Sequence, residues 1–179
     1  MNGVKNDGRA EGFLADCARI YREWHERAQT ADTEGLLALY HKEAVLESPL
    51  VQAILDDKPD GVLRGYEELR RCFEQGGRRR PNHLVRWYRT GDWLTDGRRL
   101  LVWEYPRQAP DGDQVDLVEV MEVAGGLIAC HRVYWGWKGC TLIAPTLARR
   151  GPQRETWQDR KSTRLNSSHE IPSRMPSSA

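Results

Sequence analysis

His131 carries the side chain best suited to acid–base chemistry in this chain. It lies in the segment LIACHRVYW (127–135), where the residue pattern predicts a β-strand. Alternation along a strand places His131 on one face with Ala129, Val133 and Trp135. An imidazole changes charge near neutral pH, so His131 could serve as a general acid or base. The simpler interpretation, which the sequence alone favours, is a neutral core histidine bonded to another buried group.

The pair Gly125-Gly126 predicts the tight turn that joins this strand to the one before it. A turn made of these two residues alone places Glu119 opposite Arg132. A turn that also includes Ala124 places Glu119 opposite His131. We favour the first register because two-residue turns are the commoner kind.

The favoured register assigns the preceding strand to two faces. Asp116, Val118 and Val120 share the face of His131, while Glu119 and Met121 lie on the other. Asp116 could orient the imidazole or bind a polar group of a substrate, although an exposed place at a strand end is more usual for an aspartate.

Aromatic residues are the second candidate group. Seven tryptophans are many for 179 residues. Core packing is the default role for each, but aromatic side chains with polar tips also line cavities that hold flat apolar ligands. The candidates for such a lining are Tyr21, Trp24, Trp103 and Trp135.

Helical and strand periods divide the chain into two halves. Segments 11–29, 30–41 and 65–77 have helical spacing, with Asp32 or Thr33 as a cap of the second helix and Gly-Gly as the stop of the third. A short strand, AVLESPL, lies between them and ends at Pro49. After Pro81 the period becomes two, and strands are expected in HLVRWYRT, RRLLVWEYPR, VDLVEVMEV and LIACHRVYWGW. Helices followed by an antiparallel meander predict an α+β fold.

These segments together resemble the nuclear transport factor 2-like superfamily, which includes SnoaL-like cyclases and ketosteroid isomerases. The resemblance rests on YREWHERAQTADTEGLLALYHKEAVLESPLV, GVLRGYEELRRCFE and LIACHRVYWG in that order. It implies a cone-shaped, curved antiparallel sheet wrapped around three N-terminal helices and enclosing an apolar pocket. Many members form dimers through the outer face of the sheet.

The resemblance also allows residue-by-residue comparison. Ser48 stands where ketosteroid isomerases have their aspartate base, Trp24 where they have a tyrosine, and Val118 where they have a protonated aspartate. We therefore reject steroid isomerisation. The resemblance implies that Glu47 and Ser48 lie at the pocket mouth and that the face with Val118, Val120, His131 and Trp135 lines the pocket.

Composition limits the partners. The formal charge of +1 gives no attraction to nucleic acid, and neither a secretory signal nor a membrane span is expected. The four cysteines lack metal-binding spacing, and His25, His41 and His83 are scattered, so we expect no metal, no cofactor and a cytoplasmic location with reduced thiols.

The last segment, DRKSTRLNSSHEIPSRMPSSA, resembles one reading frame of a short-read sequencing adapter at both ends. We expect a disordered N-terminus (1–10), one domain (11–150), a linker (151–158) and a disordered adapter-derived tail (159–179). Without that tail, 23 basic and 24 acidic residues remain.

The sequence thus predicts a domain that binds or transforms a small hydrophobic or aromatic molecule, with His131 and Asp116 as the acid–base candidates. The alternative is a non-catalytic ligand-binding or dimerisation module of the same fold. A homodimer through the sheet is expected because the face with Glu119 and Met121 mixes apolar and charged residues.

Overall fold

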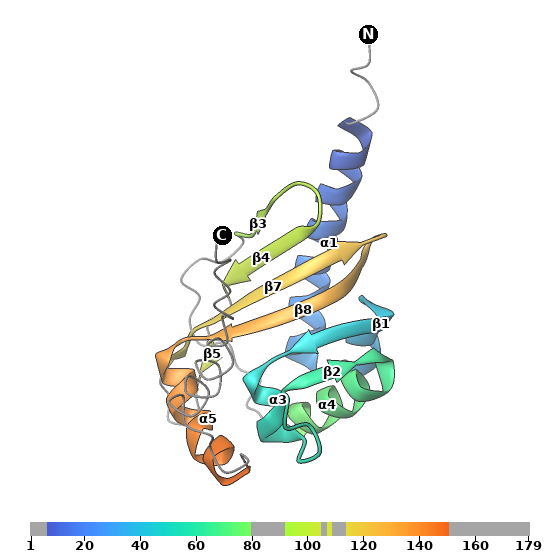
Figure 1. The fold of residues 1–179 in the computed structure, drawn as a ribbon. Helices are drawn as coiled ribbons and strands as arrows, with labels where there is room; N and C mark the ends of the chain where they lie inside the picture. Colours follow the sequence, from blue (N-terminus) through green and yellow to red (C-terminus); the bar gives the residue numbers. More distant parts are fainter. Residues whose placement is uncertain (1–6, 80–91, 105–106, 109–113, 151–179) are drawn as a thin grey trace, which may run out of the picture.

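The computed structural model describes residues 7–79, 92–104, 107–108 and 114–150 (Figure 1). These residues form five helices and eight strands, in the order α1 (Asp7–Thr30), α2 (Thr33–Leu37), β1 (Tyr40–Glu47), α3 (Pro49–Ile54), β2 (Val62–Arg64), α4 (Gly65–Arg79), β3 (Leu94–Thr95), β4 (Leu100–Glu104), β5 (Arg107–Gln108), β6 (Gln114–Val115), β7 (Leu117–Ala124), β8 (Leu127–Trp135) and α5 (Trp137–Arg150).

Six strands form one sheet in the order β2-β1-β8-β7-β4-β3, and β5 and β6 form a separate pair. The α+β class is confirmed, but the sheet is mixed rather than antiparallel, because β1 runs parallel to β8. Parallel neighbours need a long connection. Here that connection is the whole chain between β1 and β8. As a result β8, the last strand in sequence, is a central strand of the sheet.

A β-bulge decides which residues of β7 face the core. The predicted two-residue turn is correct: Ala124 pairs with Leu127, and both turn glycines have positive φ. Beyond Ile128, however, the pairing shifts by one residue, so that Met121 rather than Val120 lies opposite His131. A bulge adds one residue to one strand and reverses the faces beyond it. The favoured register is therefore wrong from this point on.

The two faces of the sheet are consequently exchanged for β7. The face packed against the helices, which we call the core face, carries Leu117, Glu119, Met121 and His131, all buried. Val118 and Val120 lie on the opposite, outer face and are half-buried. Their predicted place beside His131 is wrong, and so is the predicted pair of Glu119 with Arg132.

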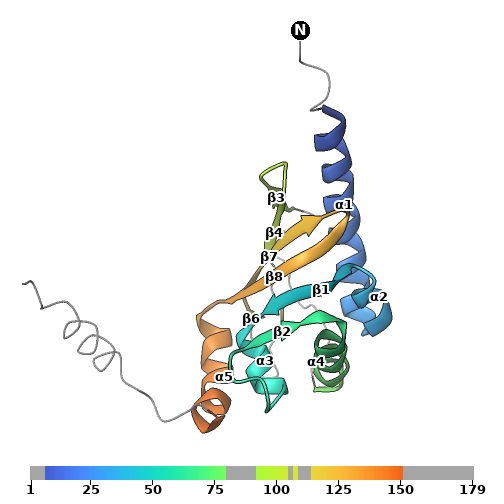
Figure 2. The same ribbon diagram turned by 45° about the vertical axis from the view of Figure 1, so that its right-hand side comes forward.

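Helix α1 lies along the core face of the sheet, and α4 lies beside β1 and β2 (Figures 1 and 2). The apolar face of α1 contributes Cys17 and Ile20, both fully buried, to a core completed by residues of β1, β4, β7 and β8. Asp32 caps α2 as expected, since its carboxylate accepts the Gly35 N–H at 2.9 Å.

Two helices were missed. α3 occupies a segment for which no helix was predicted, and α5 follows directly after β8. The two helices lie side by side beyond the end of the sheet (Figures 1 and 2). α1 begins at Asp7, inside the segment expected to be disordered, and α4 continues through its predicted Gly-Gly stop to Arg79. The strand expected at 83–90 lies outside the described residues.

Candidate functional site

A chain of hydrogen bonds crosses the core from α1 to β7. The indole N–H of Trp24 donates to Tyr40 Oη at 3.2 Å, and Tyr40 Oη lies 2.8 Å from Nδ1 of His131. On the other side of the ring, His131 Nε2 lies 2.5 Å from Oε2 of Glu119. His131 is 1% exposed and Glu119 3%. The acid beside His131 is therefore Glu119.

The donor and acceptor roles in this chain follow from its first member. An indole N–H can only donate, so Tyr40 Oη accepts from Trp24 and is free to donate its own proton to Nδ1 of His131. Nε2 of His131 then carries a ring proton and donates a hydrogen bond to the Glu119 carboxylate. Burial, the largest cause, raises the pKa of Tyr40, which keeps its hydroxyl protonated.

Aromatic rings from α1 and β4 gather next to this chain. The ring of Trp103 lies 5.5 Å from the rings of both Tyr21 and Trp24, in edge-on or strongly tilted arrangements. Trp103 is 2% exposed, and its indole N–H has no hydrogen-bond partner among the residues that the structure describes. The three predicted aromatic residues of α1 and β4 thus form one cluster, with a buried donor in it.

A second histidine belongs to this cluster and was not predicted. The ring of His25 lies 5.3 Å from that of Trp103, and its Nδ1 donates to the Tyr21 carbonyl at 2.6 Å. Burial lowers the pKa of His25, an effect opposed by that carbonyl and by the charge of Glu119. Its position one helical turn after Tyr21 was the available signal, because residues four apart share a helix face.

Asp116 is not brought to His131. It precedes β7, is exposed, and accepts the Gly136 N–H through its own carbonyl at 2.7 Å. That contact lies five residues along β8 from His131, or about 16 Å at the rise of a strand. Trp135, the other candidate near this end, is half-buried and packs against the core, with its indole N–H buried.

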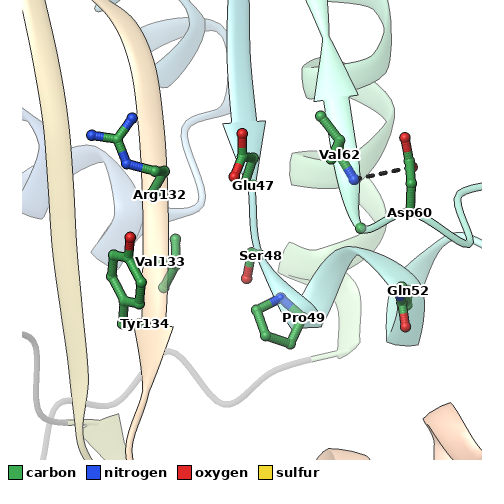
Figure 3. A pocket seen from close by; sticks show the side chains of 10 residues that line it. Glu47, Ser48, Pro49, Gln52, Asp60, Val62, Arg132, Val133 and Tyr134 are labelled. Carbon is green, nitrogen blue, oxygen red and sulfur yellow. Dashed lines mark hydrogen bonds between the residues drawn. The ribbon is translucent and has the colours of Figure 1, made fainter. Parts of the chain in front are cut away.

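Glu47 and Ser48 lie at a different place, a surface hollow of about 390 Å³ on the outer face. Figure 3 shows it between the end of β8, the end of β1 and the loop before β2. Ser48 is 8% exposed, and its hydroxyl accepts the Leu50 N–H at 3.2 Å as the cap of α3. His131 is not among the residues that line this hollow.

No three side chains of the kinds that bind metals come together within residues 7–79, 92–104, 107–108 and 114–150. In the same ranges, no helix is long and apolar enough to cross a membrane.

Comparison with known proteins agrees with this architecture. The family model of the SnoaL-like domain matches residues 21–131, which include β1, α4, β7, the aromatic candidates Tyr21 and Trp24 of α1, and His131 of β8. The chain belongs to the SnoaL-like domain family. None of the curated proteins matches this SnoaL-like domain at a significant level.

Solved structures resemble this SnoaL-like domain in fold. A steroid delta-isomerase from Pseudomonas aeruginosa is 17% identical with a TM-score of 0.53, over 85% of this chain and 96% of that one. A SnoaL-like protein of unknown function from Burkholderia thailandensis is 20% identical with a TM-score of 0.52, over 68% and 96%. A protein of unknown function with a cystatin-like fold from Methylobium petroleophilum is 15% identical with a TM-score of 0.52, over 91% and 97%.

Proposed function

We propose that this SnoaL-like domain binds a small apolar or aromatic molecule at the core face of the sheet and transforms it by acid–base chemistry. The observation that carries the proposal is the buried contact between His131 and Glu119, 2.5 Å long. Burying ionisable groups is costly, and apolar side chains of the same size would fill the core better. Such groups in a protein interior are candidates for function.

The geometry of this pair suits it to exchange a proton with a ligand. Nε2 of His131 and Oε2 of Glu119 are held in contact inside the core, so the carboxylate has a fixed position and direction. We therefore assign Glu119 as the general base and His131 as the group that orients it.

The aromatic cluster supplies the binding surface in this proposal. Tyr21, Trp24 and Trp103, whose rings already lie together, would provide the aromatic contacts to a flat ligand. The buried N–H of Trp103 would donate to an oxygen of the ligand, where negative charge develops when a proton leaves.

A ligand found by a thermal-shift screen makes the proposal testable, because binding raises the apparent stability. Glu119→Gln should keep ligand binding and lose turnover by roughly 10²–10⁴-fold, the usual contribution of a positioned base. Glu122→Gln is the matched control: it lies on the same strand but on the outer face, so turnover should persist. Full turnover in Glu119→Gln would overturn the catalytic assignment.

A second function, a non-catalytic ligand-binding module, is favoured by one observation. Both ring nitrogens of His131 are already bonded to protein groups. If the pair is purely structural, His131→Gln should lower the free energy of unfolding by roughly 1–3 kcal/mol and leave ligand affinity unchanged. Loss of turnover in a folded His131→Gln protein would exclude this alternative.

We further infer a homodimer through the outer face of the sheet and a reducing, cytoplasmic location. Half-buried Val118 and Val120 on the outer face support the homodimer. The reducing location is supported by four free cysteines, Cys17, Cys72, Cys130 and Cys140.

A further inference from the structure

The hollow on the outer face contains one carboxylate without a partner. It is lined by Glu47, Asp60 and Arg132 together with apolar and aromatic side chains (Figure 3). Neither a hydrogen bond nor an ion pair joins the Glu47 carboxylate to the described part of the chain, and Glu47 is exposed. The other two charged side chains of the hollow, Arg132 and Asp60, each have an oppositely charged partner.

Arg132 is neutralised by β7. Its Nη1 donates to Oε1 of Glu122 at 2.9 Å and to Sγ of Cys130 at 3.2 Å. The hydrogen bond with Glu122, the largest cause, raises the pKa of Arg132. Arg132 and Glu47 are neighbours across the parallel strands β8 and β1, but the guanidinium of Arg132 points away from Glu47 in Figure 3.

Asp60 is held by its own loop. Its carboxylate accepts hydrogen bonds from the Val62 N–H at 3.2 Å and from Nη1 of Arg64 at 3.1 Å. These bonds, led by that of Val62, lower the pKa of Asp60. The charge that remains unbalanced in the hollow is therefore that of Glu47.

The walls next to Glu47 are apolar or aromatic. Tyr134 is 56% exposed and follows Arg132 by two residues, which places it on the same face about 7 Å along the strand. Pro49, Val62 and Val133 supply the apolar part of the lining, which also includes Ser48, Gln52 and Gly61. A free carboxylate beside an exposed aromatic ring and apolar walls matches a positive charge carried on a compact apolar body. The volume of about 390 Å³ accommodates a small molecule of this kind.

We propose that this hollow is a second binding site, for a small organic cation, formed by Glu47 and Tyr134 and separate from the core-face site. The proposal does not depend on the acid–base chemistry proposed above, because no residue of the His131–Glu119 pair lines the hollow. It requires that the dimer contact inferred for Val102, Val118 and Val120 leaves Glu47 and Tyr134 uncovered.

The experiment titrates the protein with benzyltrimethylammonium and follows the backbone amide signals by NMR. Shifts are expected at Glu47, Val62 and Tyr134, and the affinity should fall as salt is added. The neutral benzyl alcohol and the anionic benzoate share the aromatic ring but lack the positive charge, and they should bind much more weakly. Shifts at Trp24 and Trp103 instead, or equal binding of benzoate, would overturn the assignment.

Two variants test whether Glu47 and Tyr134 bind the cation. Glu47→Gln should weaken binding by about tenfold, and Tyr134→Leu by several-fold. Glu43→Gln removes an exposed carboxylate from the same strand outside the hollow, and should bind as the wild type does. Unchanged affinity in a folded Glu47→Gln protein would refute the site. Nα-acetyl-lysine amide carries the same charge on a flexible chain, and tighter binding of that probe would refute a free, compact cation as the ligand.

Discussion

Tyr40 joins the indole of Trp24 to the imidazole of His131 through one hydroxyl oxygen, and it is fully buried. Tyr40→Phe keeps the ring and its packing but removes the bond on both sides. The half-buried indole of Trp24 and the buried Nδ1 of His131 then each lose this hydrogen bond, so we expect the free energy of unfolding to fall by roughly 1–3 kcal/mol. Chemical denaturation measures this loss. Tyr134→Phe, which removes the hydroxyl of an exposed tyrosine, should change stability little, and equal losses in the two variants would contradict the network.

His25 links stability to pH. Burial lowers its pKa below the ordinary value of 6.5, so as the pH falls the unfolded chain takes up a proton before the folded protein does. The contribution of His25 to the free energy of unfolding is therefore fully present above about pH 6.5 and decreases as the pH falls below that value. Between neutral pH and about pH 5.5, the wild type should lose more stability than His25→Leu, measured by chemical denaturation. An identical pH dependence in the two proteins would show that His25 takes up its proton equally in both states.

At the scale of elements, the loop before β2 depends on a backbone conformation that only glycine adopts freely. Gly61 has a φ of +72°, and a Cβ added there would lie 3.2 Å from the Ser48 carbonyl oxygen. Gly97 has the same φ but open space around it. Gly97→Ala should therefore cost about 1 kcal/mol for its φ alone. Gly61→Ala should cost about 1 kcal/mol more, because the backbone must shift as well. Equal melting temperatures for the two variants would contradict this account.

Elements also show what the sequence could and could not predict. The period of α1, the Asp32 cap and the Gly125-Gly126 turn are local signals, and each was correct. The predicted end of the second helix was wrong, because α2 ends at Leu37 and β1 begins at Tyr40. The bulge after Ile128 has no comparable signal, since nothing in a short alternating segment marks the extra residue. Because of this one extra residue in β8, Glu119 lies in the core and Val118 lies on the outer face. His131 and Glu119 are twelve residues apart in sequence, and their contact could not be predicted without knowledge of the bulge.

Helix α3 illustrates the opposite case, a local signal that was present but not used. Ser48 caps the helix and Pro49 occupies its first turn, a combination typical of helix N-termini. The parallel pairing of β1 with β8, in contrast, follows from the arrangement of the whole molecule. Strands 80 residues or more apart in sequence give no local indication of their direction.

The whole molecule presents an outer sheet face that we propose as a dimer interface. Val102, Val118 and Val120 lie on it in neighbouring strands and are half-buried. Met121, which the sequence placed there, is fully buried on the core face, so a charge at Met121 would disrupt the fold rather than an interface.

Val120→Glu therefore tests the dimer. The new carboxylate lies opposite both Val102 and Arg132, and the nearby guanidinium should keep the folded monomer close to the stability of the wild type. In the dimer, the same carboxylate would be buried against an apolar partner surface, which is costly. We expect the wild type to sediment as a dimer and Val120→Glu as a monomer with a similar melting temperature, while Val120→Thr, of nearly the same shape, remains dimeric. A wild-type protein that sediments as a monomer at high micromolar concentration would refute the interface.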